Sequence, residues 1–329
     1  MLAAVSAAVA QAPAIGEIDF YGLHKITAEH ILRVLHVKTG DPLPPSKGDL
    51  EDALEKIPGV VVGRVDAVCC EGPRATLFIG IEERGAPHAS FRSEPAGEAT
   101  LPEDLLSSYR QFVTAVERAA SRGETAEDLT AGHPMMADAN ARAFEQEFIS
   151  FATSHLDQLR AVLRNAAAAD QRATAAAVIN YAPKKKEIVD DLQYAVQDPE
   201  ESVRANAIRS LTAIGVLAAS QPGLGIKISP TWFIELLNSI VLTDRVESAK
   251  ALLTLTDRGD RAVLGQIRER GVPALAEMAR WKTPRYALPP FLLLGRVAGL
   301  AEAEIHQSWE KGDRETVIEK ALGNPAKKK

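Results

Sequence analysis

The sequence predicts a mainly α-helical protein, in which a small α+β domain precedes an all-α stack of antiparallel helix pairs. After residue 102, hydrophobic residues recur at helical spacing in segments of similar length over most of the chain. Before residue 84 the pattern changes instead from strand to helix and back to strand. Hydrophobic residues make up 46% of the chain and aromatic residues only 5%. Alanine therefore occupies many apolar positions, which suits closely packed helices.

The segment from Asp198 to Gly215 contains the start, the apolar face and the end of one helix. Asp198 is a candidate N-cap, Pro199 suits the first helical position, and Glu201 can complete a capping box. Gly215 is a candidate helix end. The apolar face consists of Val203, Ala207, Ile208, Leu211 and Ile214. A second helix is predicted just upstream, over residues 186–197, so the two form an antiparallel hairpin that needs further helices beside it.

This hairpin is repeated along the chain. A shift of 32 residues aligns Arg204 with Arg172 and Leu211 with Ile179. Further helix pairs are predicted over residues 232–241 and 244–253, 261–270 and 272–281, and 290–299 and 302–309, with a last helix over residues 313–322. The pattern resembles the second helix of a HEAT repeat at Asp198, Pro199, Val203, Arg204, Ala207 and Leu211. The resemblance implies a binding scaffold over residues 156–322, and the alternative is an ordinary helical bundle.

Two helices before the solenoid are expected to cap it, over residues 102–155. Three phenylalanines, Phe144, Phe148 and Phe151, share one face of the second of these helices. A terminal helix pair must shield the apolar flank of the first repeat from water, which accounts for this face.

Partner binding is expected on the concave face of the solenoid. We predict that polar residues near the helix turns, Arg172, Arg204 and Asn206, take part in it. The loop over residues 221–230 is long for a helical array, and long loops on rigid scaffolds often have a binding function.

Residues 15–84 are predicted to form the α+β domain, in the order strand, helix, helix, strand, strand. Thr27 can cap the first helix, and Pro58-Gly59 can stop the second. Two segments of alternating hydrophobicity flank the turn at residues 71–73, which predicts a β-hairpin.

This order resembles the POTRA domain of outer-membrane assembly and secretion proteins. The resemblance lies in Ile15, Ile18, Gly22, Ile31, Leu35, Gly40, Asp41, Leu50, Leu54, Gly59, Val60, Val65, Leu77, Ile79 and Glu82. It implies a three-stranded sheet backed by two helices, residence in the periplasm, and peptide binding by strand addition at a sheet edge. We place that edge on residues 60–68, with partner contacts from Val60, Val62, Arg64, Asp66 and Val68. A generic ferredoxin-like or KH-like fold is the alternative.

The remaining segments are predicted from composition. Residues 1–14 resemble the end of a secretory signal peptide, with Ala8 and Ala10 at the cleavage site, or are a disordered N-terminus. Residues 85–101 are predicted to be a flexible linker, and residues 323–329 a disordered basic tail. The protein is thus expected to be periplasmic or otherwise exported, with a cytoplasmic location as the alternative. No membrane-spanning segment is predicted.

The sequence contains no convincing active site, and we predict no enzymatic activity, cofactor or metal. His133 lacks a second histidine within helical reach, and the adjacent Cys69 and Cys70 point apart in a regular strand, so no structural disulfide is expected. A formal charge of -6 argues against a nucleic-acid partner. Protein partners, including envelope proteins, are expected, while the oligomeric state is not predicted. The rival classes are a cytosolic HEAT-like protein that binds nucleic acid, through Lys184 to Lys186, and a HEAT-like lyase.

Overall fold

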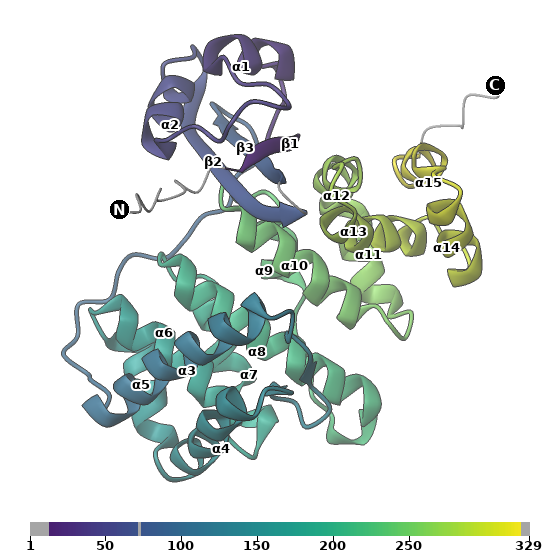
Figure 1. Cartoon of the computed structure of the whole chain (residues 1–329). Coiled ribbons are helices and arrows are strands. Elements are labelled where there is room, and N and C mark those ends of the chain that lie inside the picture. Colours follow the sequence, from purple (N-terminus) through teal and green to yellow (C-terminus); the bar gives the residue numbers. More distant parts are fainter. Residues whose placement is uncertain (1–12, 72–73, 324–329) are drawn as a thin grey trace, which may run out of the picture. The chain divides into compact units, whose positions relative to one another are not determined.

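The computed structural model describes residues 13–71 and 74–323, which form two compact units (Figure 1). Unit 1 contains the chain up to Pro87 together with residues 280–287, and unit 2 contains residues 88–279 and 288–329. The described residues form fifteen α-helices and a small mixed sheet close to the N-terminus. This confirms the predicted fold class, which is mainly α-helical with a small α+β domain.

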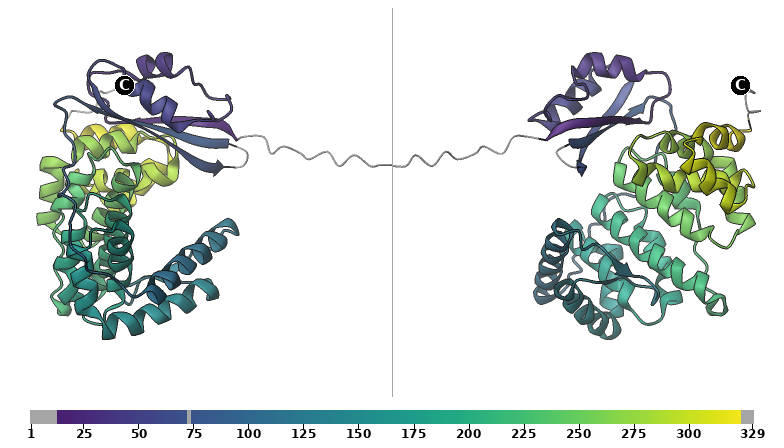
Figure 2. Two further views of the ribbon diagram at one scale, coloured as in Figure 1. Left: turned by 90° about the vertical axis from the view of Figure 1, so that its left-hand side faces the viewer. Right: turned by 45° about the vertical axis from the view of Figure 1, so that its right-hand side comes forward.

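Unit 1 contains a three-stranded sheet and two helices. Its elements are β1 (Ala14–Tyr21), α1 (Ala28–Leu35), α2 (Lys47–Glu55), β2 (Val60–Glu71) and β3 (Arg74–Glu83). The strand order is β1-β3-β2, with β1 parallel and β2 antiparallel to the central β3. Both helices cover the same face of the sheet (Figure 2). The core between them includes Ile15, Ile31, Leu54, Val65, Leu77 and Ile79, because these apolar side chains alternate along the strands and recur along the helices.

Side-chain oxygens fix the ends of the elements in unit 1. Thr27 and Ser46 accept hydrogen bonds from backbone N–H groups in the first turns of α1 and α2. Glu83, at the end of β3, accepts three further bonds from the backbone N–H groups of residues 24–26, at 2.7 to 3.0 Å. Burial raises the pKa of Glu83, but these three donors outweigh it and leave the pKa below its usual value.

The second face of the sheet is covered by residues 280–287, which the sequence analysis placed in the solenoid. The indole of Trp281 packs edge-on against Tyr21 and Phe78, and its Nε1 donates to the carbonyl of Phe20 at 2.9 Å. The carboxylate of Asp19 accepts the backbone N–H of Lys282 at 3.0 Å. Unit 1 is therefore completed by a segment about 200 residues downstream of its last strand.

Unit 2 consists of helix pairs in sequence. Its helices are α3 (Glu103–Ser121), α4 (Ala139–Ser154), α5 (Leu156–Asn165), α6 (Ala169–Val178), α7 (Lys185–Ala195), α8 (Glu201–Ser220), α9 (Thr231–Leu236), α10 (Leu242–Leu255), α11 (Arg261–Arg270), α12 (Val272–Ala279), α14 (Glu302–Glu310) and α15 (Arg314–Ala321). Helix α13 (Pro284–Val297) begins in the segment that belongs to unit 1.

The helix pairs of unit 2 stack in register. The second helices of successive pairs, α6, α8 and α10, pack side by side, and the first helices α5 and α7 do the same. Within each pair α5 packs on α6, α7 on α8, and α9 on α10. This is the arrangement of an α-solenoid, in which each repeat contacts its neighbours.

Two details of the central helix α8 differ from the prediction. Gly215 lies inside the helix, which continues to Ser220, and a Cβ at Gly215 would lie 3.3 Å from Thr254 on α10. The glycine therefore permits close helix packing and does not end α8. Asp198 is not the N-cap, because the helix begins two residues later, after Glu200, which has no side-chain cap. The Asp198 carboxylate accepts the backbone N–H of Glu200 at 3.0 Å and also binds Arg172 of the preceding repeat.

The hairpin of α3 and α4 packs against the first repeats. Helix α4 contacts α5 and α6, and α3 contacts α6. Their connection contains two-residue strands β4 (Glu127–Asp128) and β5 (Met135–Met136), which the sequence analysis treated as a polar loop. Short 3₁₀ turns, η1 (Ile179–Tyr181) and η2 (Pro222–Leu224), follow α6 and α8.

Two predictions for the ends of the chain cannot be compared with the structure, and one for the cysteines is wrong. The predicted cleavage site at Ala8 and Ala10 and most of the basic tail lie outside the described residues. Cys69, which was expected to be free of a structural disulfide, is disulfide-bonded. That expectation assumed a regular strand, whereas the register of β2 and β3 shifts between Val68 and Glu71. Among the described residues, none of the helices has the length and hydropathy needed to cross a bilayer.

Candidate functional site

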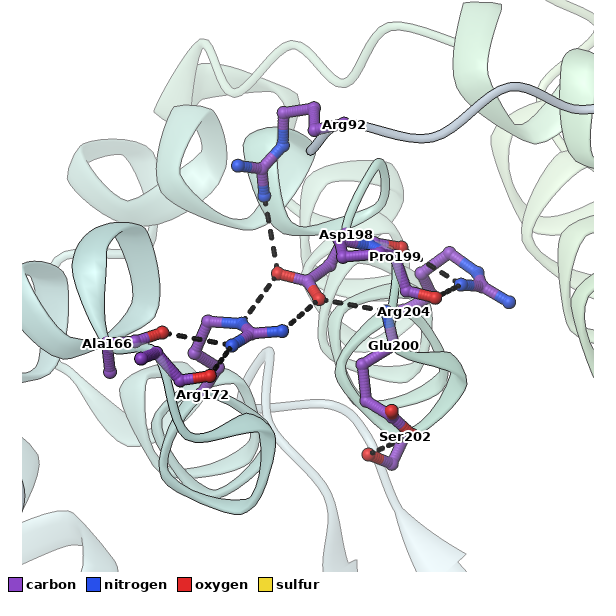
Figure 3. A network of polar contacts seen from close by, with 9 residues as sticks. Arg92, Ala166, Arg172, Asp198, Pro199, Glu200, Ser202 and Arg204 are labelled. Carbon is purple, nitrogen blue, oxygen red and sulfur yellow. Dashed lines mark hydrogen bonds and ion pairs between the residues drawn. The ribbon is translucent and has the colours of Figure 1, made fainter. Parts of the chain in front are cut away.

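A buried ladder of arginines and aspartates links the repeats of unit 2, and Figure 3 shows its step from Arg172 to Asp198. We call Arg172, Asp198, Arg204 and Asp244 the arginine–aspartate ladder. Each arginine lies in a second helix of a pair, and each aspartate belongs to the repeat that follows. Arg172 and Arg204 are 1% exposed, and both aspartates are 0% exposed.

Arg172 and Arg204 make the same contacts one repeat apart. Arg172 donates through Nε and Nη2 to the two carboxylate oxygens of Asp198, both at 2.9 Å. Its Nη1 donates to the carbonyls of Ala166 and Ala167, six and five residues upstream, at 2.9 and 2.8 Å. Four of the five N–H donors of this guanidinium are thus bonded to acceptors of the chain, which compensates for the burial of its charge.

Arg204 repeats this pattern with Asp244. Its Nε and Nη2 donate to the Asp244 carboxylate at 2.8 to 3.0 Å, and its Nη1 donates to the carbonyls of Asp198 and Pro199, again six and five residues upstream. In the third repeat, Arg245 donates to the carbonyl of Ser239 at 2.6 Å. Ser239 itself donates to Asp244 at 2.7 Å. Ser239 lies six residues before Arg245, as Asp198 lies six residues before Arg204. In this repeat the carboxylate that binds the preceding arginine therefore comes from Asp244, in helix α10.

The ladder corrects the prediction that Arg172 and Arg204 bind a partner. Both guanidinium groups are bound to carboxylates and carbonyls of the same chain. That of Arg204 is in addition covered by the ring of Phe91, so neither lies on an open face while the chain is in this arrangement. Asn206 donates to the hydroxyl of Tyr109 and to the carbonyl of Ala173, both at 2.9 Å, and so connects α8 to α3 and α6. The 32-residue spacing identified the repeat correctly but not the burial of its arginines.

Residues 88–101, predicted to be part of a flexible linker, run as an extended segment along the turns between helices. We call this segment the strap. The backbone N–H of Arg92 donates to the carbonyl of Gln197 at 2.9 Å, and that of Gly97 to the carbonyl of Asn165 at 2.8 Å. The N–H of Ala167 donates back to the carbonyl of Gly97 at 2.9 Å. The strap is therefore bound by the repeats and is not a free linker.

Side chains of the strap contact the ladder. The guanidinium of Arg92 lies 3.5 Å from the centre of the Tyr194 ring and 3.4 Å from the carboxylate of Asp198 (Figure 3). The ring of Phe91 lies 4.0 Å from the guanidinium of Arg204. Sequence analysis assigned no role to Phe91 or Arg92. The signal that could have identified them is that they are adjacent large side chains in a segment otherwise rich in small residues.

A second polar cluster surrounds Lys185 at the start of α7. Lys185 is 5% exposed, and within the described part of the chain no carboxylate forms an ion pair with it. Its Nζ lies 3.0 Å from Nδ1 of His133 and donates to the carbonyl of Asn180. Burial lowers the pKa of Lys185 to about 7. Burial, together with the charge of Lys185, lowers the pKa of His133 to about 4.

We predict that the stability of unit 2 rises with pH because of Lys185. Between pH 7 and pH 10.5, the ordinary pKa of a lysine, the unfolded chain binds more protons at this group than the folded chain does. The free energy of unfolding should therefore rise by about 2 kcal/mol from pH 7 to pH 9, at about 1.4 kcal/mol per pKa unit. Urea unfolding at both pH values, followed by circular dichroism, measures this change.

The matched variants are Lys185→Met and Lys186→Met. Lys186 is exposed, so its replacement should leave the rise unchanged, whereas Lys185→Met should abolish it and raise the stability at pH 7. An unchanged pH dependence in Lys185→Met would show that Lys185 is solvated in the folded chain.

The predicted binding strand β2 lies at an edge of the sheet in unit 1. Two of its backbone N–H groups are directed away from β3 and donate to carboxylates on α2, that of Val65 to Glu51 at 3.0 Å and that of Gly63 to Glu55 at 3.4 Å. Ion pairs with α2 lie beside them, from Lys47 to Asp66 at 2.9 Å and from Arg64 to Glu51 at 3.7 Å. Charged side chains thus cover this part of the edge.

Comparison with known proteins gives no family. No protein-family model matches the sequence, and no curated protein matches it. An engineered protein of known structure is similar over 67% of this chain and 96% of its own, with 16% identity and a TM-score of 0.38. A designed armadillo repeat protein is similar over 58% and 90%, with 14% identity and a TM-score of 0.37. Human deoxyhypusine hydroxylase, solved with glycerol, is similar over 67% and 95%, with 16% identity and a TM-score of 0.20.

At these TM-scores the similarities support no conclusion about function. The class of the protein follows from its own packing: unit 2 is a helical-repeat solenoid, whose successive pairs are joined by the arginine–aspartate ladder. Among residues 13–71 and 74–323, no three histidine, cysteine or acidic side chains are grouped so that they could hold a metal ion.

Proposed function

We propose that this chain is a non-enzymatic scaffold of the bacterial cell envelope that binds other proteins. The stacked helix pairs of unit 2 support the scaffold role, because solenoids expose long surfaces for binding. The POTRA-like element order of unit 1, with two helices on one face of a β1-β3-β2 sheet, supports the envelope location.

The observation that carries the binding mode is the edge of β2. The outward N–H groups of Gly63 and Val65 are satisfied by glutamate side chains and not by a neighbouring strand. The backbone carbonyls of an incoming extended segment can replace these carboxylates without leaving a donor unpaired. The register of β2 with β3 is regular from Val62 to Val68, so the N–H of Ala67 points the same way and extends the row of donors.

This mode also defines the partner. It is an extended segment that adds to β2, and it has to displace the ion pairs of Lys47 and Arg64 from the edge. Because these pairs are partly exposed, salt weakens them. Moderate salt should therefore favour strand addition.

Site-specific photo-crosslinking tests the proposal. A photoreactive amino acid replaces Ala67, which is exposed on β2, in the full chain expressed with a C-terminal tag in its native organism. We expect crosslinks from Ala67 to an extended segment of an envelope protein, recovered from the periplasmic fraction. The same group at Arg33, an exposed position on α1, serves as the control and should give no such product.

Two results would contradict the proposal in different ways. Recovery of the tagged chain from the cytosol would remove the envelope role. Equal products from Ala67 and Arg33 in the periplasm would leave the location intact but remove strand addition at β2 as the binding mode.

A further inference from the structure

We infer that the turns between the helices of unit 2 form a binding surface for extended peptides that carry an aromatic–arginine pair, and that the strap is the chain's own occupant of this surface. We call this surface the turn ridge; it comprises the turns at residues 165–167 and 197–199 with the adjoining Tyr194 and Arg204. The inference is independent of the β2 edge, because every residue that supports it belongs to unit 2.

The backbone of the strap is in register with the repeats. Gly97 donates to the carbonyl of Asn165, and Arg92 donates to the carbonyl of Gln197. Asn165 lies seven residues before Arg172, and Gln197 lies seven residues before Arg204. The strap thus uses equivalent acceptors in two successive repeats, as an extended ligand of a solenoid does.

The side chains supply the specificity. Tyr194 and Asp198 together offer an aromatic face and a carboxylate to one arginine, at 3.5 and 3.4 Å from Arg92. The guanidinium of Arg204 offers a flat cation to an aromatic ring, 4.0 Å from Phe91. Close approach of the backbone at Asn165 needs a glycine, because a Cβ at Gly97 would lie 2.5 Å from the Asn165 carbonyl oxygen. The preferred ligand therefore has an aromatic residue, an arginine, and a glycine five positions after the arginine.

The surface remains formed when the strap leaves it. Asp198 is held by Arg172, and Arg204 by Asp244, through bonds that do not involve the strap. The strap is anchored at its end by Leu101, which is 5% exposed and whose N–H donates to Gln171 at 2.7 Å. From residue 88 to residue 100 it has no buried side chain, so this part can leave the surface while Leu101 stays in place. A peptide with the same chemistry on another protein can therefore replace it.

A labelled peptide with the sequence of residues 88–101 tests this inference on the full chain. In the variant with Phe91→Ala and Arg92→Ala the chain's own strap is weakened, so the peptide should bind at least about tenfold more tightly than it binds the unmodified chain, by fluorescence anisotropy. A peptide with the same two substitutions is the matched control and should not bind. Absence of binding to a variant whose circular dichroism spectrum and thermal melting are unchanged would overturn the inference.

A second measurement does not depend on the folding of that variant. Hydrogen exchange of the unmodified chain is followed by mass spectrometry, with and without an excess of the unlabelled peptide. Competition should speed the exchange of the amides of Arg92 and Gly97 in the chain itself. Unchanged exchange at peptide concentrations far above the affinity measured for the variant would equally overturn the inference.

Discussion

Replacement of Arg204 by methionine is expected to lower the free energy of unfolding of unit 2 by about 3–5 kcal/mol, because it leaves a buried carboxylate without its cation. Asp244 is 0% exposed and receives Nε and Nη2 of Arg204. The hydroxyl of Ser239, which donates to Asp244 at 2.7 Å, would remain as a neutral donor. The carbonyls of Asp198 and Pro199 would lose their donor as well. Urea unfolding followed by circular dichroism measures the loss.

The control is Arg110→Met on α3. The side chain of Arg110 is 59% exposed and pairs with an exposed glutamate, so its loss should cost less than about 1 kcal/mol. The double variant Arg204→Met and Asp244→Asn should recover part of the stability, because it removes the orphaned charge. A loss below about 1 kcal/mol in Arg204→Met alone would show that Asp244 reaches water in the folded chain.

The ladder shows what could be predicted from the sequence and what could not. The spacing of Arg172 and Arg204 identifies two repeats, because equivalent positions in a solenoid recur at a constant interval. Whether these arginines are exposed depends on carboxylates of the following repeat. The position of that carboxylate within its repeat is not constant. Asp198 precedes Arg204 by six residues, whereas Asp244 directly precedes Arg245. The apolar and polar spacing within one helix therefore does not reveal which aspartate binds which arginine.

Helix boundaries were predictable where local chemistry determines them. Helix α11 has the predicted bounds, Arg261–Arg270. Asp260 caps it, because its carboxylate accepts the backbone N–H groups of Ala262 and Val263. In α8 tertiary contacts compete with the local signals. Asp198 lies two residues before the N-cap and binds Arg172 as well as the N–H of Glu200, and Gly215 lies against Thr254 inside the helix instead of ending it. Local signals describe a helix correctly only where no neighbour competes for the same group.

Sequence patterns could not predict which residues cover the second face of the sheet in unit 1. Phe78 and Tyr21 point away from α1 and α2, and this alternation predicts only that the second face of the sheet is apolar. The residues that cover it, 280–287, are separated from β3 by residues 88–279 of unit 2. A contact between such distant segments leaves no periodic signal in either of them.

Replacement of Trp281 by alanine is expected to lower the free energy of unfolding of unit 1 by about 3–5 kcal/mol, the usual loss for a buried tryptophan. Trp281 is 2% exposed, and its ring centre lies 5.2 Å from that of Phe78 and 6.2 Å from that of Tyr21. The substitution would remove both ring contacts and the donor of the Phe20 carbonyl. Hydrogen exchange of the β3 amides measures the effect in unit 1 alone.

Trp281→Phe separates packing from the hydrogen bond. It keeps an aromatic ring against Phe78 but loses the indole N–H, so the loss should be smaller, about 1–3 kcal/mol for an unsatisfied buried carbonyl and the reduced ring volume. Trp309→Ala is the control, because Trp309 packs on Phe291 and its loss should leave exchange in β3 unchanged. If Trp281→Ala left the β3 amides as protected as before, residues 280–287 would lie beside the sheet without stabilising it. Protection lost in Trp281→Ala and largely kept in Trp281→Phe would instead establish that the sheet depends on a distant segment of the chain for its second face.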